Sequence, residues 1–212
     1  MYAPAYMGLG WTYWLEWTWQ WSRDPQTLER ALALAQKAKA LDGSLASIRM
    51  LLGWIYLRQK RHEQAIAEGQ RAIALDPKGA YAYTGLGGIL NFVGRPEEAV
   101  GLVEHAARLN SQMADFCSLK LGLSHYLLKR HEEAITDAQR ALVRFPQIPG
   151  VHTLLAALYG ETGQTAKARA EADAVWQISP RFSLEVWRQT SPYKDPAMTE
   201  RFLNALSKGG LK

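Results

Sequence analysis

Small and apolar positions recur along this chain with one long period. The segment from Ala65 to Pro77 reads AIAEGQRAIALDP, and a degenerate version of it, ALALAQKAKALDG, begins at Ala31. Three further versions begin at Ala99, Ala134 and Ala168. The starting points lie 34 or 35 residues apart, a period that is typical of stacked helical repeats. We therefore expect a solenoid, in which each unit packs mainly against its neighbours.

Another helix precedes this segment in each period. For the unit that begins at residue 46, the pattern predicts helices over 46–59 and 63–75, joined by a turn at 60–62. Gly53 in the first helix is expected to face Ala65 in the second, which lets two antiparallel helices approach closely. Pro77 then ends the second helix. We expect four such units, over residues 46–79, 80–114, 115–148 and 149–182.

The residues of these units resemble the tetratricopeptide repeat. Gly53 with Tyr56, Ala65, Ala72 and Pro77 match its pattern of Leu-Gly, a tyrosine three residues later, spaced alanines and a closing proline. The later units follow the same pattern with a few substitutions. The resemblance implies an all-α fold, namely a right-handed α-solenoid of antiparallel helix pairs (a TPR superhelix).

The sequence of residues 1–45 predicts a helix pair of the same type that is degenerate, elongated and rich in tryptophan. The stretch before its alanine segment is nine residues longer than in the next unit, so its first helix is expected to run to about residue 22. Asp24 and Pro25 are expected to begin its second helix. Four tryptophans of the elongation are candidate contacts to a second copy or another domain, with core packing as the alternative: Trp14, Trp17, Trp19 and Trp21. A membrane-surface anchor is disfavoured, because the polar face of this helix has no Lys or Arg.

Residues 183–212 lie beyond the repeats. Ser183 can cap a short helix, and Asp195-Pro196 can begin another whose apolar face carries Phe202 and Leu206. We expect these helices to cap the exposed end of the array.

Composition excludes several classes of function. The chain has 25 Lys and Arg against 20 Asp and Glu without a basic run, so nucleic-acid binding is not expected. It has no apolar run long enough to span a bilayer and no secretion signal, which predicts a cytoplasmic protein without membrane insertion. Cys117 is the only cysteine and allows no disulfide within the chain.

No group of residues predicts an active site. His62 and His131 occupy the same turn of two different units, which is too far apart for sharing a metal ion. Cys117 is interpreted as a small core residue and not as a nucleophile. Pairs of glutamates at the start of second helices, such as Glu97-Glu98, stabilise the helix because their negative charges lie at the positive end of its dipole. We expect no catalysis, no metal and no cofactor.

The resemblance implies that the first helices line a concave face whose free side chains meet a partner. By the repeat alignment these positions hold Met50, Trp54, Leu57, Arg58, Tyr81, Thr84, Asn91, Phe92, Leu119, Leu123 and Tyr126. The set is aromatic and apolar, which fits an amphipathic helix or an apolar peptide segment. It is too apolar for reading RNA bases and lacks the polar set with which family members clamp a chaperone's carboxylate. We therefore expect a non-enzymatic scaffold that binds a protein or peptide.

Two alternatives remain open. An internal helix or a second protomer can fill the concave face in place of a partner. The two flanks, MGLGWTYWLEWTWQWSRDP and residues 180–212, also resemble the C-terminal tetratricopeptide regions of bacterial signalling proteins with a class III adenylate/guanylate cyclase domain. This second resemblance implies a regulatory or oligomerisation module, although the chain contains no cyclase motif.

Overall fold

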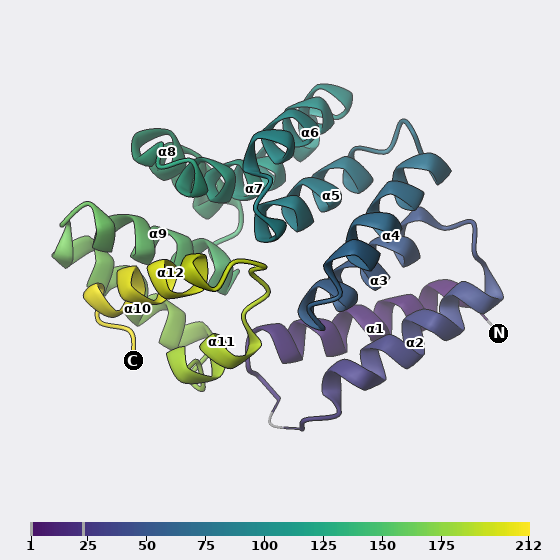
Figure 1. The fold of residues 1–212 in the computed structure, drawn as a ribbon, viewed down its shortest axis with the longest axis horizontal. Helices are drawn as coiled ribbons and strands as arrows, with labels where there is room; N and C mark the ends of the chain where they lie inside the picture. Colours follow the sequence, from purple (N-terminus) through teal and green to yellow (C-terminus); the bar gives the residue numbers. More distant parts are fainter. Residues whose placement is uncertain (1, 23) are drawn as a thin grey trace.

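The computed structural model describes residues 2–22 and 24–212, and within these ranges it contains helices and no strand (Figure 1). The α-helices are α1 (Ala3–Thr18), α2 (Thr27–Leu41), α3 (Ala46–Arg58), α4 (His62–Leu75), α5 (Ala80–Val93), α6 (Pro96–Leu109), α7 (Ala114–Leu127), α8 (His131–Arg144), α9 (Pro149–Glu161), α10 (Thr165–Ile178), α11 (Leu184–Thr190) and α12 (Pro196–Lys208). A short 3₁₀ turn, Ser111–Met113, precedes α7. The predicted all-α fold is confirmed.

Small residues set the spacing within the helix pairs, as the sequence predicts. A Cβ atom added to Gly53 would lie 3.2 Å from the carbonyl oxygen of Ala65, and one added to Gly122 would lie 3.3 Å from that of Ala134. Both alanines are fully buried. The backbones of α3 and α4, and of α7 and α8, therefore approach so closely that even an alanine at the glycine position would require a shift of a few tenths of an ångström.

The pairs stack through their first helices. α3 contacts α5, α5 contacts α7 and α7 contacts α9, while each second helix contacts the pair that follows it. The four helices α3, α5, α7 and α9 therefore form one continuous layer. We call the inner surface of this layer the concave face.

The segment that follows α1 contacts the segment that follows α10. The indole Nε1 of Trp21 donates a 2.8 Å hydrogen bond to the hydroxyl oxygen of Ser179, after α10. The side chain of Gln20 bonds the backbone of Ser183 twice, at 3.2 Å to its carbonyl oxygen and at 3.0 Å from its N–H. Figure 1 shows the C-terminal end of α1 beside α11. The first helix thus reaches from the first pair of the array to the last.

The structure corrects two predicted boundaries. α1 ends at Thr18 and not near residue 22, because Gln20 adopts a left-handed conformation (φ 57°) and the N–H of Trp21 returns to the carbonyl of Glu16 at 2.8 Å. α2 begins at Thr27 and not at Pro25. Asp24 forms a turn instead of a cap, since its carboxylate accepts the N–H of Gln26 at 2.9 Å.

The C-terminal segment contacts the last helix pair, where a cap was expected, and also reaches further along the array. α12 packs on α9 and α10, and the loop before α12 crosses to the early repeats. In this loop the N–H of Lys194 donates to the carbonyl of Phe92 at 2.8 Å, and Nε2 of His62 lies 3.1 Å from the carbonyl oxygen of Pro192. The loop before α12 therefore lies over the concave face, while residues 209–210 pack against α10. No helix in the described ranges has the length and apolarity needed to cross a bilayer.

Candidate functional site

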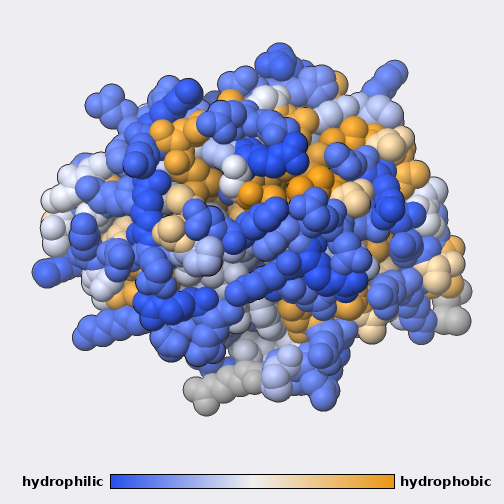
Figure 2. Space-filling model, viewed as in Figure 1, coloured by the Kyte–Doolittle hydropathy of each residue, from blue (hydrophilic) through white to orange (hydrophobic). Residues whose placement is uncertain are grey.

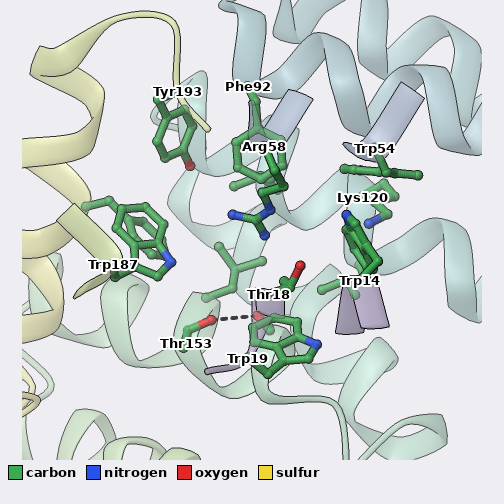
Figure 3. A pocket seen from close by; sticks show the side chains of 15 residues that line it. Trp14, Thr18, Trp19, Trp54, Arg58, Phe92, Lys120, Thr153, Trp187 and Tyr193 are labelled. Carbon is green, nitrogen blue, oxygen red and sulfur yellow. Dashed lines mark hydrogen bonds between the residues drawn. The ribbon is translucent and has the colours of Figure 1, made fainter. Parts of the chain in front are cut away.

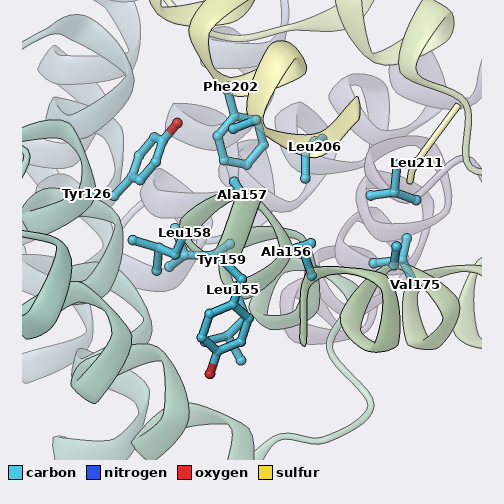
Figure 4. Packing of buried hydrophobic residues seen from close by; sticks show 14 of the residues in the cluster. Tyr126, Leu155, Ala156, Ala157, Leu158, Tyr159, Val175, Phe202, Leu206 and Leu211 are labelled. Atoms are coloured by element: carbon cyan, nitrogen blue, oxygen red, sulfur yellow. The ribbon is translucent and has the colours of Figure 1, made fainter. Parts of the chain in front are cut away.

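The chain itself covers part of the concave face. The ring of Phe202, on α12, lies 5.6 Å from that of Tyr126, and the ring of Tyr193 lies 4.9 Å from that of Phe92. Figure 4 shows Phe202 of α12 next to Tyr126 and above Ala157 of α9. An internal helix on this face is one of the two alternatives that the sequence left open.

The eleven residues predicted to meet a partner divide into two groups. Six are buried: Met50, Trp54, Leu57, Thr84, Asn91 and Tyr126. Five keep partial exposure: Arg58, Tyr81, Phe92, Leu119 and Leu123. The buried polar members have partners within the chain, as Asn91 does, which donates to the carbonyl of Lys120 at 3.1 Å. Contact of these residues with a partner stays a prediction.

Glu161, the last residue of α9, anchors the C-terminal segment. Arg201 of α12 donates two hydrogen bonds to its carboxylate, both 2.8 Å, and the Tyr126 hydroxyl donates another of 2.7 Å. His131 Nε2 lies 2.9 Å from the second carboxylate oxygen. Burial raises the pKa of Glu161, but the hydrogen bonds from Arg201, Tyr126 and His131 outweigh it and hold the pKa below its usual value.

Beside this covered part lies a cavity of about 120 Å³, which we call the aromatic pocket (Figure 3). Its rings come from the first helices and from both ends of the chain: Trp14, Trp19, Trp54, Phe92, Trp187, Tyr193 and Phe202. Leu119, Leu123 and Leu154 add aliphatic walls. Figure 2 shows hydrophobic side chains surfacing between hydrophilic ones on the face of the molecule seen in Figure 1. Concave, mainly apolar cavities with a few polar groups are typical of ligand sites.

Two cations line the aromatic pocket, and no Asp or Glu is among its described lining residues. Within the described chain, neither the Arg58 guanidinium nor the Lys120 ammonium has a hydrogen bond or ion pair. The Lys120 ammonium lies 4.8 Å from the Trp54 ring centre, and the Arg58 guanidinium lies 6.0 Å from that of Trp14. Burial lowers the pKa of Lys120 to about 8, with the Arg58 charge adding to the effect. Burial also lowers the pKa of Arg58 to about 10.

Polar atoms without partners gather at the same place. Four buried side-chain nitrogen or oxygen atoms in the described chain lack a hydrogen-bond partner, and three of them belong to pocket residues: Trp14 Nε1, Thr18 Oγ1 and Arg58 Nε. Buried polar groups in folded proteins nearly always have a partner. Such a concentration of exceptions marks the aromatic pocket as the candidate functional site.

The four N-terminal tryptophans make contacts within the chain. Trp14 lies 5.7 Å from Trp54 between ring centres, Trp21 bonds Ser179, and the Arg58 guanidinium lies 5.8 Å from the Trp17 ring centre. Trp19 packs on α9, where a Cβ added to Gly150 would come within 2.7 Å of its ring. A role of these residues in oligomer or interdomain contacts stays a prediction, with Trp21 still 40% exposed.

Sequence reasoning missed several pocket residues, Lys120 among them. In the repeat alignment Lys120 occupies the position two residues before Gly122, where the other units have Leu51, Gly85 and Leu154. A lysine at an apolar or small position of the repeat was a usable signal. For Thr18, Trp187 and Tyr193 no repeat position exists, because they belong to the two ends of the chain.

The other candidate groups have structural explanations. Cys117 is buried in the core, as predicted, and its Sγ lies 3.5 Å from the Thr84 hydroxyl. His62 and His131 contact different partners, the carbonyl of Pro192 and the carboxylate of Glu161. Among the residues that the structure describes, no group of three or more His, Cys, Asp and Glu side chains is placed to hold a metal ion.

Solved structures share this fold across most of the chain. The crystal structure of PilW, a widely conserved type IV pilus biogenesis factor, has a TM-score of 0.64 and 17% identity and covers 98% of this chain and 89% of its own. A thermophilic TPR protein from Thermus thermophilus has a TM-score of 0.64 and 21% identity over 85% of this chain and 91% of its own. A structure of Pseudomonas aeruginosa pilF has a TM-score of 0.61 and 22% identity, and it covers 98% of this chain and 88% of its own. At these identities the likeness shows the fold alone.

Sequence comparison identifies the family. A TPR repeat-containing protein of Treponema pallidum (strain Nichols) is 30% identical over 130 residues, which are 61% of this chain but 14% of that protein. The chain thus spans a small part of this relative's length. The profile of the tetratricopeptide repeat family matches residues 26–80 and 92–150, more than half of the chain. The protein therefore belongs to the tetratricopeptide repeat family.

Proposed function

We propose that the protein is a non-enzymatic scaffold that binds a helical or apolar segment of a partner protein on its concave face. The observation that carries this proposal is α12 itself, an amphipathic helix that the concave face already accepts. Its apolar residues Phe202, Leu203 and Leu206 are buried against the repeats, while Glu200 and Asn204 face solvent. Helix-in-groove binding uses the same pattern of apolar anchors.

The partner segment would lie beside α12, over the part of the face that keeps some exposure. Phe92, Leu119 and Leu123 are half-buried there and line the mouth of the aromatic pocket. Aromatic and aliphatic side chains with little freedom provide much contact area at low entropic cost, as at interface hot spots. Arg58 would set the orientation of the segment through its charge.

Selection from a library of short helical peptides, followed by fluorescence anisotropy with the purified protein, tests the proposal. Leu119→Ala and Leu123→Ala are each expected to weaken the selected peptide by about fivefold or more, since truncating an interface anchor costs more than about 1 kcal/mol. Val143→Ala is the matched control, because Val143 is 87% exposed on α8. Failure to enrich any peptide, or equal affinities for all variants, would contradict the proposal.

The finer hypotheses from the sequence have less support. Self-association through the N-terminal tryptophans competes with the intrachain contacts that Trp14, Trp19 and Trp21 already make. Light scattering of the purified protein over a range of concentrations tests it directly. A regulatory role in a cyclase-type protein stays a prediction from the flanks, because no relative described above has a name of that kind.

A further inference from the structure

The aromatic pocket contains an unbalanced positive charge. Arg58, at the end of α3, and Lys120, on α7, both line it, and its remaining titratable lining residue is Tyr193. Each cation contacts tryptophan rings, but attraction to an aromatic ring is weaker than pairing with an anion. Two like charges sharing a poorly solvated cavity repel each other, and one negative group between them would relieve this repulsion.

Unpaired hydrogen-bond donors belong to three residues that line the same space. Thr18 is only 6% exposed, and its hydroxyl has no partner among the described residues. The indole N–H of Trp14 and Nε of Arg58 are also buried without partners. Figure 3 shows the Arg58 guanidinium in the middle of the pocket, between Trp14 and Trp187. These three atoms are closed off from solvent, whereas the Arg58 Nη atoms and the Lys120 ammonium are not among the buried atoms and belong to residues that line the cavity. The terminal nitrogens of the two cations are therefore the donors that an acceptor with several lone pairs, such as a carboxylate, would meet in the pocket.

The remaining walls suit a flat apolar body. Trp14, Trp19, Trp54 and Trp187 present ring faces and edges around a cavity of about 120 Å³. For comparison, a dry apolar cavity of about 150 Å³ holds one benzene molecule. The enclosed space is therefore too small for a helix or an extended peptide and takes at most about one ring or a short aliphatic chain. Because the pocket is partly open to solvent, the carboxylate of a ligand would lie outside this volume.

We propose that the aromatic pocket binds a small organic carboxylate, with the carboxylate between Arg58 and Lys120 and a ring-sized apolar body against the tryptophans. This ligand site does not depend on the scaffold function proposed above. The ligand would contact α1, α3, α7 and α11 together, so it would also link the two ends of the chain to the repeats.

Titration of the full chain with phenylacetate, followed by calorimetry and by tryptophan fluorescence, tests the site. Binding is expected with a Kd below about 1 mM, in keeping with a ligand of this size. Phenylacetamide has the same shape without the charge and is expected to bind at least about tenfold more weakly, because charge-assisted hydrogen bonds are roughly twice as strong as neutral ones. Acetate, which lacks the ring, is expected to bind at least about tenfold more weakly as well.

Two variants place the ligand in the pocket. Lys120→Met keeps the apolar stem and removes the charge, so it should weaken phenylacetate at least about tenfold and leave phenylacetamide unchanged. Leu123→Phe should fill the cavity and weaken both compounds while both cations stay in place. Lys78→Met is the matched control, because Lys78 is exposed in the turn after Pro77.

Each of three results would overturn the proposal. The first is no binding of phenylacetate at ten times the expected Kd. The second is equal affinity for the acid and the amide, which would make the pocket merely apolar. The third is an unchanged phenylacetate affinity in Lys120→Met while the variant remains folded by circular dichroism, which would place the compound elsewhere.

Discussion

Arg201 of α12 and Glu161 of α9 form a two-pronged ion pair, with Nε and Nη2 of the arginine each 2.8 Å from one carboxylate oxygen. The pair is mostly shielded from solvent, with 21% of the arginine side chain and 16% of the glutamate side chain exposed. The same arginine donates to the carbonyl oxygen of Tyr126 at 3.1 Å, so it connects α12 to both α7 and α9. This contact fixes the position of the C-terminal segment over the concave face.

Glu161→Gln is expected to destabilise the protein by about 2 kcal/mol at pH 7, because it leaves the charge of Arg201 without a counterion in a mostly buried place. The effect should depend on pH. The pKa of Glu161 lies below its usual value in the folded protein, so its contribution is present above the unfolded pKa and lost as the pH falls through the folded one. Urea unfolding at neutral and at acidic pH should show the difference from wild type shrinking in acid.

The matched control is Glu200→Gln, which breaks the exposed pair of Glu200 with Arg188 and should change stability by less than about 0.5 kcal/mol. A loss in Glu161→Gln that stays constant down to acidic pH would contradict the assignment. So would a loss no larger than that of the control.

Gly160 of α9 lies directly against the backbone of α12. A Cβ added there would lie 2.2 Å from the carbonyl oxygen of Ala205, which is backbone and cannot move aside alone. Gly160→Ala should therefore displace α12, lower the free energy of unfolding by roughly 1–3 kcal/mol and speed amide exchange in residues 196–208. The measurement is hydrogen exchange with mass spectrometry, together with urea unfolding.

Gly101, on α6, offers the opposite case, since a Cβ added there meets no atom within 4 Å. Gly101→Ala should stabilise the protein by about 0.5–1 kcal/mol through helix propensity. The structure therefore predicts that the two substitutions change the free energy of unfolding in opposite directions. Stabilisation by both substitutions would show that α12 does not pack on α9 as described.

The repeat architecture could be predicted because its cause is local and periodic. Gly53 and Gly122 each face an alanine of the partner helix, and that requirement returns with every unit along the sequence. The helices predicted over 46–59 and 63–75 match α3 and α4 to within one residue for the same reason. The end of α1 was missed because Gln20 adopts a left-handed conformation, which no periodicity reveals.

The candidate site could be predicted only in part. Trp54, Arg58, Phe92, Leu119 and Leu123 were named from the repeat alignment, and all five line the aromatic pocket. The opposite wall comes from the two ends of the chain, which meet through contacts between residues more than 150 positions apart. Repeat periodicity carries no information about such contacts, so the covering of the concave face by α11 and α12 was open until the structure was known.

The contact between Gln20 and Ser183 should contribute measurably to the free energy of unfolding. The Gln20 side chain is 9% exposed and makes two hydrogen bonds to the backbone of Ser183. Gln20→Ala removes both and leaves the N–H of Ser183 without its partner, while the Ser183 carbonyl keeps its hydrogen bond from the N–H of Trp187. Glutamine and alanine both carry a Cβ atom, so the substitution leaves the backbone strain at this left-handed position unchanged. The expected loss is about 1–2 kcal/mol in urea unfolding. Gln26→Ala, in the exposed turn before α2, is the control, and an equal effect of the two would contradict the bridge between the ends.

The free energy of unfolding should rise with pH because Lys120 loses its buried charge. Its pKa is about 8 in the folded protein, because burial disfavours the charged form and Arg58 repels it, whereas an unfolded lysine has a pKa of about 10.4. Between these values the unfolded chain binds a proton that the folded chain has released, so the free energy of unfolding rises with pH across this window.

Lys120→Met removes the charge and should therefore be more stable than wild type at pH 7, by an amount that falls towards zero near pH 10. One pKa unit corresponds to about 1.4 kcal/mol, so the shift sets an upper bound of about 3 kcal/mol on the gain. Urea unfolding of both proteins at pH 7 and at high pH measures the difference, with Lys78→Met as the exposed control. A variant that is less stable than wild type at pH 7 would show that the Lys120 ammonium is already paired in the protein, and the unbalanced charge of the aromatic pocket would then no longer hold.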